Sequence, residues 1–462
     1  MLGSLQYQRG MIAHRAALAL PGATFRRVTV FPGKLSYALM LLFIVVLYAS
    51  PGMLIRQLAA IGPSQLVGGL ALAALAFEKS KNREGIWLVW PHSHLFLAMI
   101  WIAGLSCFTA IWPRLSAITT IDLVKYFIIY LVLVNSVDSG SRLKGVFWTM
   151  VLAGLFPALG TLHSYASGNV PAGETAHWVG NFANPNDLAY SIVLLVPLAL
   201  ALLDELRGWR RPFLWGVIAI YTATIYVTFS RGSLIGLMAV LLLIGLRHRS
   251  GSVRLVIFGA IATSLIFVAF FWSRQEGFTN LADFTLHMRL TTVRAGLEMF
   301  LDRPLLGVGL GCSVAAFPIY APQNLDFTKA LVIHNTFLQA LSELGLFGCL
   351  FLVLFVATGL FDARRIVRAA GSEEVWNADL RSDDRKKEVP SAFLRAKPRS
   401  MRQPSTAALV DGIAISLWGY IVCGLFGPYL MSWFPFILVG LISAAKKMRQ
   451  QDAAVVSTGD SL

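Results

Sequence analysis

The sequence predicts an all-α, polytopic membrane protein with about twelve transmembrane helices. Of its 462 residues, 56% are hydrophobic and only 14% are charged, which is too apolar for a soluble chain of this size. A helix that crosses about 30 Å of hydrocarbon needs roughly 20 apolar residues, because its backbone polar groups must be satisfied within the helix. The stretches that meet this requirement are 35–54, 61–77, 94–112, 119–136, 145–163, 187–203, 212–229, 232–246, 254–272, 344–361, 407–427 and 430–445.

The positive charges predict the orientation of these spans. If the N-terminus is cytoplasmic, 30 of the 39 Lys and Arg residues fall in cytoplasmic segments. Cytoplasmic loops of membrane proteins are enriched in Lys and Arg, so we expect both chain ends in the cytoplasm. The net charge of +15 then follows from topology and from contact with anionic membrane lipid, and nucleic acid is not an expected partner.

Hydropathy and charge divide the chain into five parts. The first 34 residues contain several arginines but no cleavage site after a short apolar core, so they are not predicted to be a signal peptide. The parts are a cytoplasmic N-terminal tail (1–34), N-terminal transmembrane helices (35–163), a core with long outside loops at 164–186 and 273–343 (164–361), a charged, solvated cytoplasmic loop (362–406) and a C-terminal helix pair with a tail (407–462).

The outside loop 273–343 carries a helical pattern of its own. Apolar residues recur there at helical spacing, at Leu290, Val293, Leu297 and Phe300. The pattern ends at Pro304 and predicts an amphipathic helix lying on the outer membrane surface. The next segment, Gly307-Val-Gly-Leu-Gly311, follows no strand, so we expect a flexible turn rather than a nucleotide-binding loop.

The cysteines predict neither disulfides nor a metal site, and the charges inside the spans do not predict a transporter. The four cysteines are scattered, which predicts no disulfide framework and no metal site. The spans are almost free of charge, whereas transporters concentrate ionisable groups near mid-membrane. We therefore expect the chemistry at the outside face, without a cofactor.

The first candidate segment on that face precedes the sixth span. It reads Gly180-Asn-Phe-Ala-Asn-Pro-Asn-Asp187, where Pro185-Asn186-Asp187 predicts the capped start of a helix. A turn and a cap would explain these residues structurally. Amide and carboxylate side chains beside an indole would also suit sugar hydroxyls. The candidate substrate-binding residues here are therefore Trp178, Asn181, Asn184, Asn186 and Asp187.

Arginines mark two further candidate segments. Arg231 lies in Thr228-Phe-Ser230-Arg-Gly-Ser233, where it could reach lipid phosphate, or could bind a substrate phosphate together with the free N–H groups of a helix start. Arg289 and Arg294 lie on the predicted interfacial helix. Pairing of Arg294 with Glu298 at i,i+4 is the structural alternative to a catalytic role.

The fourth segment is His334-Asn335-Thr-Phe-Leu338, directly before the tenth span. Asn335 in this segment and Ser230 beside Arg231 are further candidate substrate-binding residues. A lone histidine is usually structural, but this one lies at a membrane boundary on the same side as the three arginines. With a reference pKa near 6.5, an imidazole at that place could take a proton from a hydroxyl nucleophile at neutral pH.

Together these segments resemble the O-antigen ligase and polymerase family of integral-membrane enzymes. The most specific match is His-Asn-x-x-Leu followed by Gly345 seven residues later. The supporting matches are Asn181-x-x-Asn184-Pro-Asn-Asp187, Ser230-Arg231-Gly232 and the stretch from Arg294 to Pro304-x-x-Gly307-x-Gly309.

The resemblance implies glycan transfer from an undecaprenyl-diphosphate-linked donor at the periplasmic face of the bacterial inner membrane. No Asp-x-Asp occurs in an outside loop, so we expect this transfer to need no metal. Arg231 and either Arg289 or Arg294 would hold the diphosphate, and His334 would activate the acceptor hydroxyl. The acceptor is expected to be lipid A-core oligosaccharide. A polymerase acting on a second lipid-linked repeat, a protein O-oligosaccharyltransferase and a lipid-linked sugar transporter remain alternatives.

Overall fold

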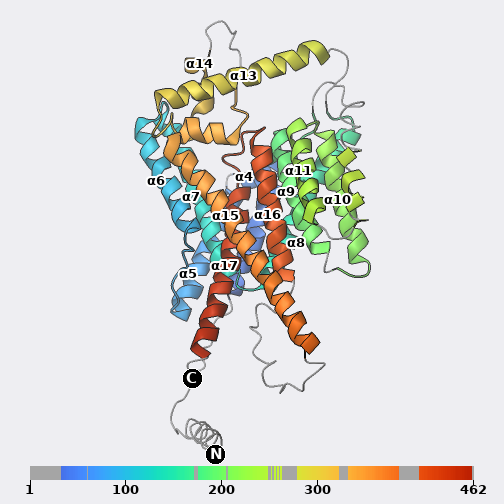
Figure 1. The fold of residues 1–462 in the computed structure, drawn as a ribbon. Coiled ribbons are helices and arrows are strands. Elements are labelled where there is room, and N and C mark those ends of the chain that lie inside the picture. The colour runs from blue at the N-terminus through green and yellow to red at the C-terminus, as the bar shows by residue number, and fades with distance from the viewer. Residues whose placement is uncertain are drawn as a thin grey trace, which may run out of the picture.

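Every regular element that the structure describes is a helix, which confirms the predicted all-α class (Figure 1). The computed structural model describes residues 33–59, 61–170, 175–203, 206–247, 251, 254–255, 257–259, 261–262, 278–321, 331–383 and 405–459. The tail 1–32 and most of the loop 362–406 beyond residue 383 lie outside these ranges.

Six of the described helices are long and apolar enough to cross a bilayer. They are α6 (His92–Thr109), α7 (Pro113–Ser136), α8 (Gly140–Ala166), α9 (Pro185–Leu203), the Thr336–Gly371 part of α15 (Thr336–Asp383) and the Thr406–Gly424 part of α16 (Ser405–Gly424). The chain is therefore a multi-pass membrane protein by helix length and composition, whereas the number of twelve spans and their orientation stay predictions.

Helices also lie over the remaining predicted spans. Most of the span 254–272 is outside the described residues, and those of its residues that are described are helical. The helices over the other remaining spans are α2 (Lys34–Ala49), α5 (Pro63–Asn82), α10 (Arg210–Val227), α11 (Arg231–Arg247) and α17 (Phe434–Gly459). The short helices α3 (Pro51–Leu54) and α4 (Arg56–Ala59) follow α2.

Helix α9 is at the centre of one half of the bundle. It contacts α8, α10, α11 and α16, and nearly all of its residues from Leu188 to Leu203 are buried. A helix that is apolar on all sides is suited to such a position, where other helices take the place of lipid around it. The other half contains α6, α7, α15 and α17, and contacts of α16 with α15 and α17 join the two halves.

One end of the bundle is covered by α13 (Phe278–Asp302), which lies across the top of Figure 1. It packs on α14 (Ser313–Tyr320) and α15 through a small apolar core that includes Ala295, Met299 and Phe317. We call this end the α13 end. The helix predicted in loop 273–343 is thereby confirmed, and its contact with lipid stays a prediction.

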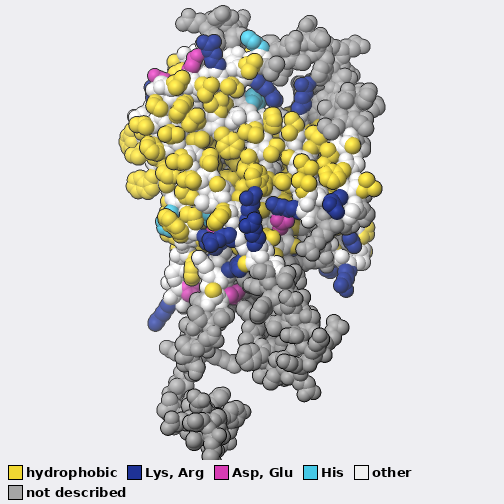
Figure 2. Space-filling model, in the orientation of Figure 1, with side chains coloured by type: hydrophobic (Ala, Val, Ile, Leu, Met, Phe, Trp, Pro, Cys, Tyr) yellow, Lys and Arg dark blue, Asp and Glu magenta, His cyan; other side chains and the backbone are white. Residues whose placement is uncertain are grey.

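Three of the four apolar residues that predicted α13 face away from the protein, and the fourth, Phe300, is half-buried. Leu290, Val293 and Leu297 are 58%, 38% and 45% exposed, while Thr292 and Ala295 are buried. Exposed apolar side chains also form a broad band across the face of the bundle seen in Figure 2, and Lys and Arg side chains gather along its lower edge. Such a band is typical of a surface that lies in lipid.

Backbone hydrogen bonds hold residues 304–309 against a break in α15. Gly345 interrupts this helix with φ 67° and ψ −166°. Val308 N donates to Ser342 O (2.9 Å), Gly309 N to Glu343 O (3.0 Å) and Leu346 N to Pro304 O (2.8 Å). The expected flexible turn at 307–311 is therefore a packed segment held by backbone hydrogen bonds.

Glycine is needed on both sides of this contact. A Cβ on Gly345 would lie 2.4 Å from the carbonyl carbon of Leu305, and a Cβ on Gly307 would lie 2.4 Å from the carbonyl carbon of Glu343. Both glycines have positive φ, a conformation that side chains with a Cβ rarely adopt. The close approach of the two backbones thus explains two of the glycines in the sequence motifs.

We predict that Gly345→Ala lowers the free energy of unfolding by about 2 kcal/mol or more, because the added Cβ meets backbone and the φ angle is strained. Thermal unfolding of the purified protein in detergent measures this effect. Gly104→Ala in α6 is the control, since a Cβ there meets nothing within 4 Å. Equal melting temperatures for the two variants would contradict the proposed need for glycine at this backbone contact.

Candidate functional site at the α13 end

The turn from α10 to α11 presents Ser230 and Arg231. Helix α11 starts at Arg231, and Leu234 N donates to Ser230 O (3.2 Å) as its first backbone bond. Phe229 has φ +49°, a left-handed conformation that is uncommon for a residue with a side chain. The N–H groups of the first turn have no acceptor within the helix. The predicted tight turn at a helix start is confirmed, and phosphate binding there stays a prediction.

Tyr190 connects this turn to α9 and to the segment between α16 and α17. Its hydroxyl donates to Phe426 O (3.0 Å). A Cβ on Gly232 would lie 2.5 Å from the Tyr190 hydroxyl oxygen and 2.7 Å from the Phe426 Cβ. The glycine of Ser-Arg-Gly therefore allows α11 to start in close contact with Tyr190.

The two arginines of α13 have different surroundings. Arg294 is exposed, and its Nε donates to Glu298 Oε1 (3.0 Å), which is the i,i+4 pair expected for a structural role. Arg289 is partly buried, and its guanidinium acts electrostatically on both His334 and Tyr190. The structure thus brings Arg289, and not Arg294, to the histidine.

His334 lies in the segment directly before α15 and is partly buried. Burial lowers the pKa of its imidazole below 6.5, and the nearby Arg289 charge lowers this pKa further. Its Nδ1 is buried and has no hydrogen-bond partner among the described residues. A neutral imidazole with an available nitrogen is the form that accepts a proton near pH 7.

Asn335 and Thr336 fix the start of α15 beside His334. Asn335 Oδ1 accepts hydrogen bonds from the N–H groups of Phe337 (3.0 Å) and Leu338 (2.9 Å), so Asn335 caps the helix. Its Nδ2 donates to Leu425 O (3.3 Å). Thr336 Oγ1 donates to Gly427 O and accepts from Tyr429 N, both at 2.8 Å. These bonds position His334, and substrate binding by Asn335 stays a prediction.

The capped start of α9 is confirmed, with Asn184 as the cap. Asn184 Oδ1 accepts from Asn186 N (2.8 Å), and Asn184 O accepts from Leu188 N (3.1 Å). Asp187 follows in the first turn, and its Oδ1 is buried without a hydrogen-bond partner among the described residues. The carboxylate acts electrostatically on Tyr190, so Asp187 belongs to the same group as Arg289.

Trp178 and Asn181 contact a different part of the bundle. Asn181 Nδ2 donates to Leu47 O in α2 (3.3 Å). The Trp178 ring packs on α8, with its centroid 5.8 Å from that of Phe156. In the described ranges no hydrogen bond joins either residue to Arg289 or His334. Their predicted contact with sugar is therefore not supported by proximity to the histidine.

Glu343 supports the site from within α15. Its buried carboxylate accepts hydrogen bonds from Ser313 Oγ, from Gly311 N (2.8 Å) and from Gln339 Nε2 (3.1 Å). These bonds tie the start of α14 and the glycine segment to the helix that carries His334 at its start. Sequence reasoning did not select Glu343, although it lies within the histidine motif.

Sequence reasoning also missed Tyr190, on which Asp187, Ser230 and Arg289 all act. A signal existed, because Tyr190 follows Asp187 by three residues and so shares its face of α9. We call Asp187, Tyr190, Ser230, Arg231, Arg289 and His334 the Tyr190 cluster. It combines two arginines, helix N–H groups and an imidazole whose pKa is lowered, a set that can bind an anion and remove a proton from a hydroxyl group.

Part of the chain matches a known protein family. Residues 216–353 match the O-antigen ligase family. The resemblance inferred from the motifs is thereby confirmed. The O-antigen ligase match includes Arg231, Arg289 and His334, whereas the Asn181–Asp187 segment precedes it.

A curated relative is similar over a longer part of the chain. The exopolysaccharide production protein ExoQ of Rhizobium meliloti (strain 1021) is 24% identical over an alignment of 290 positions that covers 58% of this chain. The chain spans 65% of the length of that relative. Both comparisons support a membrane protein of the glycan ligase and polymerase type.

We predict that Arg289→Gln raises the pKa of His334 toward 6.5, because it removes the positive charge that disfavours the imidazolium. Diethyl pyrocarbonate reacts with neutral imidazole, so the pH dependence of His334 labelling, followed by peptide mass spectrometry, reports this pKa. The midpoint should shift upward in Arg289→Gln and stay unchanged in the control Arg294→Gln. A shift of equal size in both variants would contradict the assignment of Arg289.

Proposed function

We propose that this protein transfers a glycan, the O-antigen, from undecaprenyl diphosphate to a hydroxyl of lipid A-core oligosaccharide. The reaction would take place at the periplasmic face of the bacterial inner membrane, with the α13 end facing the periplasm. The observation that supports the proposal is that the Arg289 charge is near enough to act on both His334 and Tyr190, with the start of α11 packed closely on Tyr190. The O-antigen ligase match over 216–353 supports it.

In this mechanism His334 acts as general base. Its neutral imidazole takes the proton of the acceptor hydroxyl while the oxygen forms a bond to the anomeric carbon of the donor sugar. The bond between that carbon and the diphosphate oxygen breaks, and the electron pair leaves with undecaprenyl diphosphate. A single displacement inverts the configuration at the anomeric carbon, an outcome taken from the family resemblance.

The arginines stabilise the charge that develops on the departing diphosphate. Guanidinium groups match phosphate oxygens with paired N–H donors and stay charged at any physiological pH. Arg289 and Arg231 would therefore serve where other glycosyl-transfer enzymes use a divalent metal. In the described ranges no three His, Cys, Asp or Glu side chains gather in a way that could hold a metal ion.

The long isoprenoid of the donor needs an apolar surface rather than a closed pocket. Exposed Leu290, Val293 and Leu297 line the outer face of α13, which carries Arg289. Side chains of this kind are suited to lie in the acyl region of the outer leaflet. The donor chain would run along the bundle in lipid while its diphosphate reaches the Tyr190 cluster.

A polymerase is the second candidate, because the similar protein ExoQ is described by its part in exopolysaccharide production. A polymerase would use the same donor and the same cluster, but its acceptor would be a second lipid-linked repeat. Purified protein in proteoliposomes, supplied with the donor and with either lipid A-core or more donor, separates the two. The ligase proposal fails if only the lipid-linked acceptor is extended.

We predict that His334→Ala lowers the rate of glycan transfer at least ~100-fold, because the general base is lost. His163→Ala, an exposed histidine in the last turn of α8, is the control and should retain the activity of the natural sequence. A chelator in the same assay should change the rate less than about twofold, since no metal step is expected. Full activity of His334→Ala, or loss of activity with chelator, would refute the mechanism.

We predict that Arg289→Ala and Arg231→Ala each lower the transfer rate roughly 100-fold, whereas Arg294→Ala has little effect. Arg231→Lys should restore little of the activity that Arg231→Ala loses, because an ammonium group lacks the paired donors of guanidinium. The same proteoliposome assay, with protein amounts matched by quantitative blotting, measures these rates. A larger loss in Arg294→Ala than in Arg289→Ala would reverse the assignment made from the structure.

A further inference from the structure

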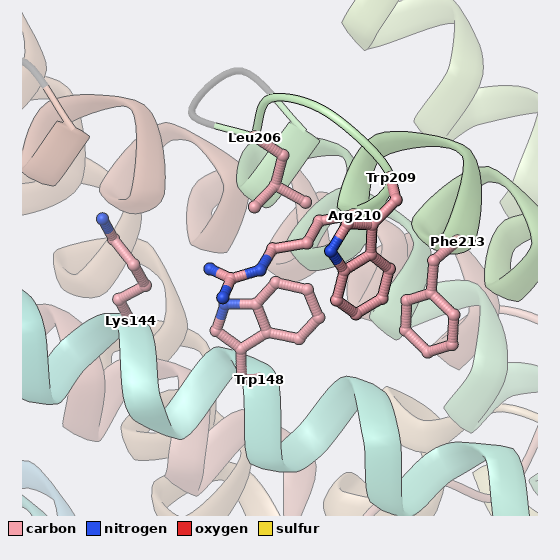
Figure 3. A pocket seen from close by; sticks show the side chains of 6 residues that line it. All are labelled: Lys144, Trp148, Leu206, Trp209, Arg210 and Phe213. Carbon is pink, nitrogen blue, oxygen red and sulfur yellow. The ribbon is translucent and has the colours of Figure 1, made fainter.

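A cavity of about 390 Å³ lies between the start of α8 and the start of α10 (Figure 3). It is at the opposite end of α10 from the turn that carries Arg231, so it is separate from the Tyr190 cluster. Its lining residues come from two elements that are distant in sequence. They are Lys144 and Trp148 of α8, and Leu206, Trp209, Arg210 and Phe213 at and before the start of α10.

Among the described residues, the two charged side chains that line this cavity are cationic. Lys144 and Trp148 are four residues apart and share one face of α8. The Arg210 guanidinium carbon is 5.9 Å from the centre of the Trp209 ring, and Figure 3 shows its side chain extended toward the α8 side of the cavity. Two cations from facing helices are suited to a phosphate group, which guanidinium and ammonium groups bind by charge-assisted hydrogen bonds.

The apolar part of the site continues along α8 into the hydrophobic band. Beyond Trp148, Leu152 and Phe156 follow at intervals of four residues and are 44% and 43% exposed. On the opposite wall Phe213 is 44% exposed. The same face of α8 therefore carries a cation, an aromatic ring and then an exposed apolar stripe. A free phosphate ion would use only the first of these features, whereas a lipid would use all three.

We propose that this cavity binds an anionic glycerophospholipid. Its phosphate lies between Lys144 and Arg210, and its glycerol region lies against Trp148 and Trp209, since tryptophan rings favour the boundary between headgroups and acyl chains. One acyl chain follows the stripe through Leu152 and Phe156. The bound lipid would thus connect α8 with α10, the helix whose other end leads into the turn with Arg231. This proposal is independent of the proposed glycan transfer.

Native mass spectrometry of the purified full chain in detergent, titrated with phosphatidylglycerol or phosphatidylcholine, tests the site. Phosphatidylglycerol should bind about tenfold more tightly than phosphatidylcholine, and sn-glycerol 3-phosphate at equal concentration should not displace it. Equal affinity for the two lipids, or displacement by the soluble phosphate, would overturn the proposal without any variant. Asp204 and Glu205 precede Leu206 in sequence and lie outside the described residues. Because the titration uses the full chain, it measures the preference for the anionic lipid with both of these residues present.

Matched variants locate the binding. Arg210→Gln and Lys144→Gln should each weaken phosphatidylglycerol binding about tenfold. Arg211→Gln is the control, because it removes the same charge from the adjacent, exposed residue, which does not line the cavity. It should stay within about twofold of the natural sequence. Similar losses in Arg210→Gln and Arg211→Gln would show that the lipid responds to general surface charge, and the proposed site would be wrong.

Discussion

The relative position of Arg289 and His334 depends on the backbone contact between residues 304–309 and the break in α15. That contact consists of three hydrogen bonds between main-chain groups, and it is possible only because Gly307 and Gly345 have no Cβ. It joins the end of α13 to the start of α15. Arg289 lies in α13 and His334 lies directly before α15. A shift at the glycines would therefore move the Arg289 guanidinium away from the His334 imidazole.

The electrostatics of the Tyr190 cluster follow from this proximity. The Arg289 charge and burial both keep the imidazole of His334 neutral, which is the state a general base requires. Within the proposed function the same guanidinium attracts the donor diphosphate. Binding of that anion would offset the charge felt by His334 and make the imidazole a stronger base while the donor is present. One cation would thus serve both substrate binding and the timing of proton transfer.

Much of the fold could be predicted because it is encoded locally. Runs of about 20 apolar residues give membrane helices wherever they occur, so the class and the position of most helices followed from the sequence. The helix around Leu290 and the capped start of α9 followed from spacing and from the Asn-Pro-Asn-Asp pattern. The histidine and arginine motifs showed the resemblance to the O-antigen ligase and polymerase family, since they depend on residue type and separation alone.

The sequence by itself therefore determined the helices, the candidate residues and the end of the bundle where they were expected. Tertiary structure decided which of them meet. Arg289 and Arg294 are five residues apart and point in different directions, and only the burial of Thr292 and Gly296 shows which face of α13 rests on the protein. Likewise, the amide of Asn335 is committed to a cap and to Leu425 O, a partner 90 residues away. Contacts between segments so distant in sequence leave no local pattern, because packing alone creates them.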